Sequence, residues 1–317
     1  MEIYQEIIKA EKQIRKYIRK TPLEFSPFFS KLGHCNVYLK LESEQLTGSF
    51  KIRGAFNKLL SCQDEFKKGF ITASTGNHGK AVAYVSRMLN IKGMVYVPKK
   101  VLKTKLEAMK YYKINIKNYD GTSGETEIHA RKIAEKKGIP FISPYNDNDI
   151  VAGQGTVGYE IWEELPDVDI VLACIGGGGL ISGIAGYLKH KNRKIKIVGC
   201  EPRNSCAMSA SIKAGKVIEV EHKPTLSDGS AGGVEPDSIT FEFCKKYVDD
   251  YVQVSEKEIK KGMALMIEKH HKIIEGAAAV PIASLIKKKS LFANLNVVVV
   301  LSGSGVGMDT IRKVVRK

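Results

Sequence analysis

Residues 169–183 read DIVLACIGGGGLISG, an apolar strand that runs into four glycines and then into a helix. An uninterrupted apolar run of this kind is typical of a strand buried on both faces, as in a parallel sheet. Glycine lets the backbone approach an anion closely, and a helix N-terminus directs free N–H groups toward it. The stretch therefore predicts an α/β fold with a phosphate-binding turn at the carboxyl end of a strand.

Two common phosphate-binding motifs do not fit these glycines. Gly178 and Gly183 have the Walker spacing, but Ile184 stands where that motif requires lysine. The dinucleotide pattern G-x-G-x-x-G also fails, because Ser182 or Ile181 occupies the position of its last glycine. The interpretation that remains is a site where mainly backbone groups bind a phosphate, such as that of a cofactor monoester. The alternative is a tight turn between strand and helix that binds no ligand.

Strand and helix patterns alternate on both sides of this stretch. Strands are expected at 37–41, 70–73, 94–97, 114–119, 141–143, 169–175, 195–200, 251–254 and 297–301. Helices are expected at 1–19, 52–60, 78–89, 102–112, 125–137, 153–165, 180–189, 255–271 and 277–288, with one more at the C-terminus. This alternation predicts parallel sheets with helices on both faces, and ligands at the carboxyl ends of the strands.

The chain of 317 residues has an ordinary globular composition, with 43% hydrophobic and 26% charged residues. This composition excludes a mainly disordered or fibrous protein. The longest aliphatic run, residues 297–301, is far shorter than the ~20 residues that span a bilayer, so we expect no membrane association. Charges interrupt the N-terminal residues, and no secretory signal is expected.

Lysine and arginine outnumber aspartate and glutamate by 50 to 34, which gives a net charge of +16. Such a surplus raises the question of nucleic acid. The basic residues are scattered in twos and threes on polar helix faces, so we interpret them as solvated surface and expect no nucleic-acid partner. The six cysteines form no C-x-x-C pair, which argues against a disulfide scaffold and favours a reducing cytoplasm.

Residues 47–55 read TGSFKIRGA and follow the strand expected at 37–41. Small residues surround Lys51 at the start of the expected helix, near the positive end of the helix dipole. Desolvation and this dipole both lower the pKa of a lysine and make its amine nucleophilic. On this segment alone, an ordinary solvated lysine stays the alternative.

Two further polar turns follow expected strands. Residues 72–79, TASTGNHG, place hydroxyls, an amide and free N–H groups at one helix N-terminus, which suits a carboxylate; we interpret His78 there as structural rather than as a base. Residues 301–307, LSGSGVG, follow the last strand. A phosphate cradle, an activated lysine and a carboxylate pocket together indicate pyridoxal phosphate with an amino-acid substrate.

The chain resembles the threonine/serine dehydratase branch of the fold-type II, tryptophan-synthase β-like, pyridoxal-phosphate enzymes, which also holds the eukaryotic-type serine racemases. The matching segments are SFKIRGA at 49–55, ASTGNHG at 73–79, VAGQGT at 151–156, GGGGLISGIA at 176–185, VGCEP at 198–202, SDG at 227–229, VDDYVQVSEKEI at 248–259, EGAAAV at 275–280 and LSGSG at 301–305. The resemblance implies an α/β fold with two open, twisted, mostly parallel sheets and flanking helices. It places a large cofactor-binding domain at 1–48 and 147–317, a small domain at 49–146, and the active site between them.

The resemblance also implies pyridoxal 5'-phosphate as the cofactor and assigns residues to it. Lys51 would bond covalently to the cofactor and later move the substrate Cα proton. Phe50 would flank the ring, Asn77 would hydrogen-bond the phenolic oxygen, and Ser302 would face the pyridine nitrogen. The phosphate would be held by Gly176, Gly177, Gly178, Gly179 and Leu180. The substrate carboxylate would be framed by Ser74, Thr75, Gly76, Asn77 and His78.

The expected reaction is α,β-elimination of water from L-threonine or L-serine, giving a 2-oxo acid and ammonia. A neutral hydroxyl at Ser302 does not force protonation of the ring nitrogen, which favours prompt loss of a β-leaving group. In serine racemases a serine hydroxyl just before Gly-Asn-His serves the second face of the substrate, and Thr75 stands there. We therefore assign Thr75 as a second catalytic residue, for slow side reactions with D-serine.

Three alternatives stay open at this point. They are a serine racemase, a dehydratase of another β-hydroxy amino acid such as 3-hydroxyaspartate, and a basic nucleic-acid-binding protein on an inactive enzyme fold. A homodimer is common in the family and is expected. Because the chain ends shortly after Ser302, we expect no C-terminal regulatory domain.

A cation site is only weakly indicated. Racemase-like members of the family bind a divalent cation beside a Glu-Pro pair. Glu201 and Ser205 fit that site, but Ala207 stands where a second carboxylate would be expected, and a hard dication prefers several oxygens.

Overall fold

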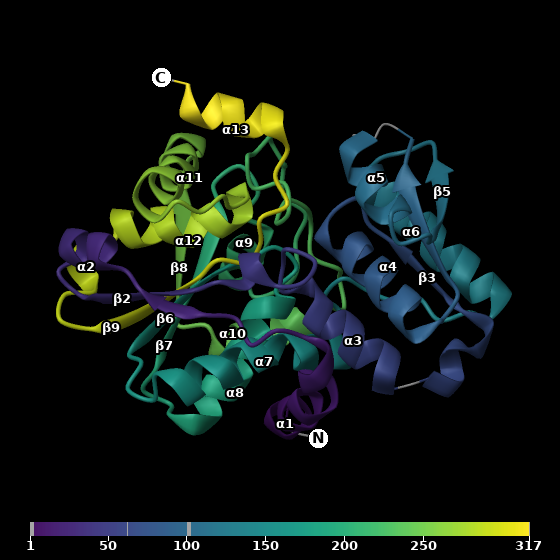
Figure 1. Ribbon diagram of the computed structural model, residues 1–317, viewed down its shortest axis with the longest axis horizontal. Helices are drawn as coiled ribbons and strands as arrows, with labels where there is room; N and C mark the ends of the chain where they lie inside the picture. Colours follow the sequence, from purple (N-terminus) through teal and green to yellow (C-terminus); the bar gives the residue numbers. More distant parts are fainter. Residues whose placement is uncertain (1–2, 62, 100–102, 317) are drawn as a thin grey trace.

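The computed structural model describes residues 3–61, 63–99 and 103–316 and contains two sheets (Figure 1). Six strands form one sheet in the order β1-β2-β9-β6-β7-β8, and three strands form the other in the order β3-β4-β5. β1 runs antiparallel to β2, whereas the other strand pairs are parallel. The predicted α/β class with mostly parallel sheets is therefore confirmed.

The strands of the larger sheet come from both ends of the chain: β1 (Leu23–Phe25), β2 (Asn36–Lys40), β6 (Ile170–Cys174), β7 (Lys196–Pro202), β8 (Asp250–Val254) and β9 (Asn296–Val300). The smaller sheet comes from the segment between them: β3 (Phe70–Ala73), β4 (Gly93–Pro98) and β5 (Asn115–Tyr119). The domain boundaries expected at 48/49 and 146/147 stay a prediction.

The helices alternate with these strands along the chain. They are α1 (Ile3–Ile14), α2 (Pro27–Gly33), α3 (Lys51–Ser61), α4 (Asn77–Leu89), α5 (Lys103–Lys110), α6 (Ser123–Lys137), α7 (Asn148–Glu164), α8 (Gly179–Lys191), α9 (Ala207–Ala214), α10 (Ile239–Tyr247), α11 (Glu256–His270), α12 (Gly276–Lys287) and α13 (Met308–Val315). The helix expected at 1–19 is α1 followed by a 3-10 turn, and it packs on α7 and α8 through Ile7 and Ile3.

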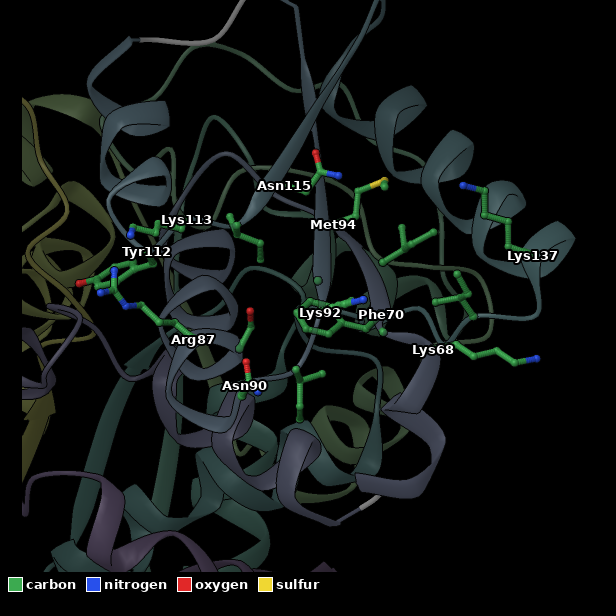
Figure 2. Close-up of a pocket in the computed structure, with 17 residues that line it drawn as sticks. Lys68, Phe70, Arg87, Asn90, Lys92, Met94, Tyr112, Lys113, Asn115 and Lys137 are labelled. Atoms are coloured by element: carbon green, nitrogen blue, oxygen red, sulfur yellow. The ribbon is translucent and has the colours of Figure 1, made fainter.

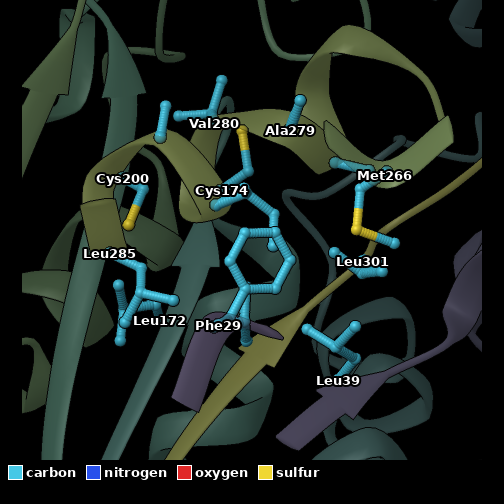
Figure 3. Close-up of a cluster of buried hydrophobic side chains, with 14 of the residues drawn as sticks. Phe29, Leu39, Leu172, Cys174, Cys200, Met266, Ala279, Val280, Leu285 and Leu301 are labelled. Atoms are coloured by element: carbon cyan, nitrogen blue, oxygen red, sulfur yellow. The ribbon is translucent and has the colours of Figure 1, made fainter. Parts of the chain in front are cut away.

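The larger sheet is buried on both faces, as the apolar strands predict. Leu172 and Val299 face α11 and α12, in a cluster that also holds Phe29, Cys174 and Cys200 (Figure 3). Their neighbours Val171 and Val298 face the opposite way, toward α7 and α8. Because successive strand side chains alternate between faces, two separate cores need an apolar residue at nearly every position.

The smaller sheet is also covered on both faces. Val95 and Val97 of β4 pack with α3 and α4, while Ile71 and Tyr96 pack with α6. α3 and α4 are thus held between the two sheets (Figure 1). This arrangement puts the carboxyl end of β3 beside the segment that opens α3.

The strand expected at 141–143 was wrong. Phe141 makes a single bridge to Ile71, and the chain then turns at Pro144 before α7. The sequence patterns did not predict β1 and α2. They also did not predict α9 and α10, which lie between the strands expected at 195–200 and 251–254. The first residue of the helix expected at 102–112 lies outside the described residues.

Candidate active site

The turns that follow β2, β3, β6 and β9 meet at one place in the fold. Phe50 donates its N–H to the carbonyl of Ser302 at 3.1 Å, and Ser49 forms a bridge with Gly303. Asn77, after β3, contacts Glu275 and thereby the last turn. Parallel strands bring the turns after β2, β6 and β9 to the same edge of the larger sheet. The contact of Asn77 with Glu275 brings the turn after β3 of the smaller sheet to that edge.

Lys51 is the first residue of α3 and is half-buried. Its Nζ donates a hydrogen bond to the carbonyl of Pro144 at 2.7 Å and lies 5.1 Å from the centroid of the Phe50 ring. Burial lowers the pKa of Lys51 to about 8, although the charges of Glu275 and Glu127 act in the opposite direction. The amine therefore becomes neutral, and nucleophilic, at a lower pH than an ordinary lysine.

A buried ion cluster fixes the helix that carries Lys51. Arg53 is fully buried and bonds Glu42 from its Nε at 2.7 Å and Glu160 from Nη1 and Nη2 at 2.8 Å each. Lys40 pairs with the same Glu160 at 2.7 Å. Because a buried charge that loses its partner costs several kcal/mol, this cluster holds the start of α3 rigidly against β2 and α7.

The glycine turn at 176–179 ends β6 and opens α8. Gly178 adopts a left-handed backbone with φ +87° and is the N-cap of α8, without a side-chain cap. A Cβ at Gly177 would lie 2.3 Å from the Tyr145 ring, and one at Gly176 would lie 2.9 Å from the backbone of Ser230. Glycine is therefore required by the neighbouring residues, and the first N–H groups of α8 stay open to an anion.

Leu180 is the second residue of α8 and is 5% exposed. Thr240 steadies the turn by donating its hydroxyl to the carbonyl of Gly177 at 2.5 Å. Neither Thr240 nor Tyr145 was singled out in the sequence. Both act by packing on the glycines, and only the folded chain brings them there.

The turn after β3 holds the expected carboxylate-binding residues. Ser74, Thr75, Gly76 and Asn77 are half-buried, and Gly76 donates its N–H to Ser74 Oγ at 3.2 Å. α4 begins at Asn77 with Gly76 as its N-cap and no side-chain cap. An uncapped helix N-terminus beside a serine and a threonine hydroxyl is suited to a carboxylate.

His78 is 3% exposed, and its Nε2 lies 3.2 Å from Thr72 Oγ1. Burial, with a further contribution from the charge of Lys51, lowers the pKa of His78 to about 3. The imidazole is therefore neutral at physiological pH. This geometry favours the structural interpretation of His78 over a role as a base.

Glu275 is a site residue that the sequence did not reveal. It is 4% exposed and accepts hydrogen bonds from Asn77 Nδ2 at 3.0 and 2.8 Å and from the Gly305 N–H at 3.1 Å. It belongs to EGAAAV, a segment that carried the resemblance but no assigned role. No local pattern marks it, because its partner is 198 residues away.

Ser302 tests whether the site fits the expected cofactor. Its hydroxyl is buried and has no hydrogen-bond partner among the described residues. A buried hydroxyl without a partner is costly and is normally satisfied by a ligand or water. Together with the open N–H groups at 176–180 and the amine of Lys51, it gives the donor set that pyridoxal phosphate requires.

Glu201 and Ser205 have hydrogen-bond partners outside the expected site residues. Glu201 accepts N–H bonds from Met208 at 3.1 Å and Ser209 at 3.2 Å, at the start of α9. Ser205 Oγ lies 2.8 Å from His222 Nδ1. Within the part of the chain that the structure describes, no group of three or more His, Cys, Asp or Glu side chains could hold a metal ion.

A cavity of about 640 Å³ opens at the other end of the smaller sheet, at the amino ends of β3, β4 and β5 (Figure 2). Its lining includes Phe70, Met94 and several basic side chains, but none of the expected site residues. This cavity is thus separate from the edge where Lys51 lies.

The chain is similar to known proteins over nearly its whole length. A family model described as pyridoxal-phosphate dependent enzyme matches residues 14–303. The L-threonine ammonia-lyase of Thermotoga maritima is 36% identical over 99% of this chain and 78% of its own length. The catabolic L-threonine dehydratase TdcB of Escherichia coli is 38% identical over 98% of this chain and 94% of its own length.

Solved structures show the same fold. The processed threonine deaminase isoform 2 of Solanum lycopersicum superposes with a TM-score of 0.93 at 30% identity, covering 99% of this chain and 92% of that one. The serine racemase of Dictyostelium discoideum superposes with a TM-score of 0.89 at 33% identity, covering 96% and 99%.

Proposed function

Because the chain belongs to the family of pyridoxal-phosphate-dependent enzymes, we propose that it is an ammonia-lyase that eliminates water from L-threonine or L-serine. The products are a 2-oxo acid and ammonia. The observation that carries this proposal is the position of Lys51. Its amine has a lowered pKa, and the preceding residue, Phe50, bonds the turn at Ser302. The Thermotoga and Escherichia relatives, named for L-threonine, support this substrate class.

The residues of the site would hold the cofactor as follows. Lys51 would bond to it covalently, with Phe50 against its ring and Asn77 and Ser302 at its polar atoms. The backbone N–H groups of residues 176–180 would bind its phosphate at the N-terminus of α8. When bound, pyridoxal phosphate withdraws electrons from the substrate Cα and acidifies its proton.

The chain's own residues position the substrate and move its proton. The N-terminus of α4, with Ser74 and Thr75, would bind the carboxylate. Lys51 would take the Cα proton on Nζ, which requires the neutral amine. The Pro144 carbonyl, 2.7 Å from that nitrogen, orients the amine toward the site. The expected acid–base contribution of such a positioned group is about 10²–10⁴-fold in rate.

A racemase is the second candidate, and Thr75 is the residue that favours it. Its hydroxyl stands just before Gly76-Asn77-His78, at the position that serves the second face of the substrate in racemases. Thr75 has a methyl group that restricts its rotamers, so we assign it a minor D-serine activity beside elimination.

The test is an assay of 2-oxo acid and ammonia over a panel of L- and D-threonine, L- and D-serine and L-3-hydroxyaspartate. We expect the L-threonine and L-serine reactions to exceed the others. D-serine formation faster than elimination would instead identify a racemase. A higher rate with 3-hydroxyaspartate would identify a different dehydratase.

We further propose a cytoplasmic homodimer without a nucleic-acid partner. The cysteines at 35, 174, 200, 206 and 244 are free, which suits a reducing compartment. None of the helices among the described residues has the length and apolarity to cross a bilayer. Light scattering of the purified protein tests the dimer.

A further inference from the structure

Glu275 occupies a helix N-cap but does not cap the helix. It precedes α12 with extended backbone angles, φ −77° and ψ 165°, and its side chain makes no capping hydrogen bond. The carboxylate instead accepts from Asn77 on α4 and from Gly305 after β9. The helix dipole favours a carboxylate near a helix N-terminus, but the hydrogen bonds of this one go to the turns of the site rather than to the first N–H groups of α12.

Two glycines make room for this contact. A Cβ at Gly303 would lie 2.6 Å from Glu275 Oε1, and a Cβ at Gly305 would lie 2.6 Å from Asn77 Oδ1. Alanine at either position would displace the carboxylate or the amide. The LSGSG turn therefore accommodates the Asn77–Glu275 pair.

The carboxylate determines which way the Asn77 amide faces. An ionised carboxylate only accepts hydrogen bonds, so Asn77 must turn its NH₂ group toward Glu275. The orientation of an asparagine amide is assigned from such a network. The two Nδ2 contacts, at 3.0 and 2.8 Å, both go to this one carboxylate. An N–H shared between its two oxygens leaves the second N–H for another acceptor. A neutral glutamine at 275 both donates and accepts, and would allow either orientation.

The same carboxylate is the acidic group with the largest influence on Lys51. Its charge favours the protonated amines of Lys51 and Lys80. The carboxylate lies close to the segment that opens α3, because Gly303, whose Cβ would lie 2.6 Å from Glu275 Oε1, forms a bridge with Ser49. Glu127 contributes in the same sense, while the nearby His78 is neutral. Charges interact more strongly in a partly buried site than in solvent. A single carboxylate therefore has a larger effect on the pKa of a lysine here than it would at the surface.

We propose that Glu275 is a positioning residue: it fixes the Asn77 amide with one N–H toward the cofactor and places its carboxylate beside the segment that carries Lys51. This inference rests on the proposed cofactor contacts of Asn77 and Lys51. It assigns a role to the buried acid that neither the composition nor the glycine motifs revealed.

The experiment compares holoenzymes with Glu275→Gln, Glu275→Asp and Glu256→Gln. Glu256, at the start of the neighbouring helix α11, is a matched control, because it is half-buried and its carboxylate accepts an N–H bond from Leu226 at 2.6 Å. Two properties are measured: the pH midpoint of the visible absorbance of the bound cofactor, and the cofactor dissociation constant. Circular dichroism checks that each variant is folded.

We expect Glu275→Gln to lower the absorbance midpoint by about one pH unit, the low end of what a neighbouring opposite charge produces. The cofactor dissociation constant should rise about tenfold, the size of one charge-assisted hydrogen bond. Glu275→Asp keeps the charge and should have an absorbance midpoint close to that of wild type. Glu256→Gln should change neither the midpoint nor the dissociation constant.

The inference fails if Glu275→Gln weakens cofactor binding without moving the midpoint, because a merely structural residue would behave that way. It also fails if Glu256→Gln moves the midpoint equally. Should Glu275→Gln not fold, the cofactor affinity of Glu275→Asp decides, because the shorter side chain draws the carboxylate away from Asn77. An unchanged affinity in that variant would remove the positional argument. If wild type binds cofactor but eliminates none of the panel substrates, the proposed reaction fails while this titration still stands.

Discussion

The two ends of the smaller sheet differ in what the chain places there. At the carboxyl end of β3, residues 74–78 combine small polar side chains with the N-terminus of α4 and lie beside a buried carboxylate. At the amino ends of the same strands lies the cavity of about 640 Å³, rimmed by Lys68, Arg87, Lys92, Lys113 and Lys137. Among the described residues that line it, none is Asp or Glu.

The two ends differ in the chemistry of their side chains. The basic rim lies where α4 and α6 end, and helix C-termini carry partial negative charge that lysine and arginine offset while remaining in solvent. The opposite end holds a helix N-terminus, a lysine with a lowered pKa and the unpartnered Ser302 hydroxyl. A buried polar group without a partner among the described residues indicates a place where a ligand or water binds.

The largest expected effect contrasts a lysine from each end. Lys51→Ala should abolish elimination, because the cofactor link and the proton carrier are both lost, whereas Lys92→Ala at the cavity should leave kcat within twofold. Borohydride reduction should fix the cofactor to one lysine in wild type and in Lys92→Ala. Full activity of Lys51→Ala would overturn the site.

The glycine turn gives the second contrast. Gly178→Val should reduce cofactor affinity more than tenfold, because its Cβ would lie 2.9 Å from Met208 Cε and 3.0 Å from Thr240 Cβ and shift the turn. Gly215 is the matched control, since it has φ +74° but no atom within 4 Å of its Cβ. Both valines pay a similar backbone cost of about 1–2 kcal/mol.

Cofactor occupancy, measured by absorbance, separates the two variants. Gly215→Val should lose thermal stability yet bind the cofactor normally, whereas Gly178→Val should be largely colourless. Equal occupancy in both would show that the turn has no ligand.

Sequence patterns predicted the parts of the site that local physics specifies. The apolar run before Gly176 marks a buried strand, and the glycines after it mark a close approach of the backbone; both are visible in a few residues. The prediction of a strand at 141–143 was wrong, because the apolar residues there pair with the sheet at one bridge only, between Phe141 and Ile71. β1 was missed because three residues beside Pro22 carry almost no periodic signal.

The contacts that shape the site could not be predicted in this way. Glu275 and Tyr145 act on residues far away in the sequence, and nothing next to them differs from an ordinary helix start or loop. Arg53 stood in the quoted motif, but its burial among Glu42, Glu160 and Lys40 depends on three separate elements. Tertiary packing, rather than propensity, decides these positions.

The pH dependence of elimination is the third effect, and it follows from burial at the Lys51 end. Because burial lowers the pKa of Lys51 to about 8, the neutral amine is lost as the pH falls below that value. The rate should therefore fall about tenfold per pH unit on the acid side, as one proton blocks the base. With a solvated lysine as the base, the rate would already begin to fall below pH ~10. The measurement is kcat against pH for L-threonine; a limb above pH ~10 would show that Lys51 is not the buried base.

Thr75→Ala should have the smallest effect on the main reaction and separates the two faces of the substrate. Thr75 is half-buried in the turn before α4, whereas Lys51 approaches from the start of α3. Racemisation needs a proton carrier on each face of the planar carbon, and Lys51 serves only one.

The alanine variant should keep L-threonine elimination within about twofold, because the other groups at the α4 N-terminus still bind the carboxylate. D-serine formation and D-serine elimination should fall at least tenfold, the lower range for a lost acid–base group. Thr75→Ser is the control, since it keeps the hydroxyl without the methyl group and should retain or increase the D-serine reactions. If D-serine chemistry is robust in wild type and equal in the alanine variant, another group protonates the second face and the assignment of Thr75 is wrong.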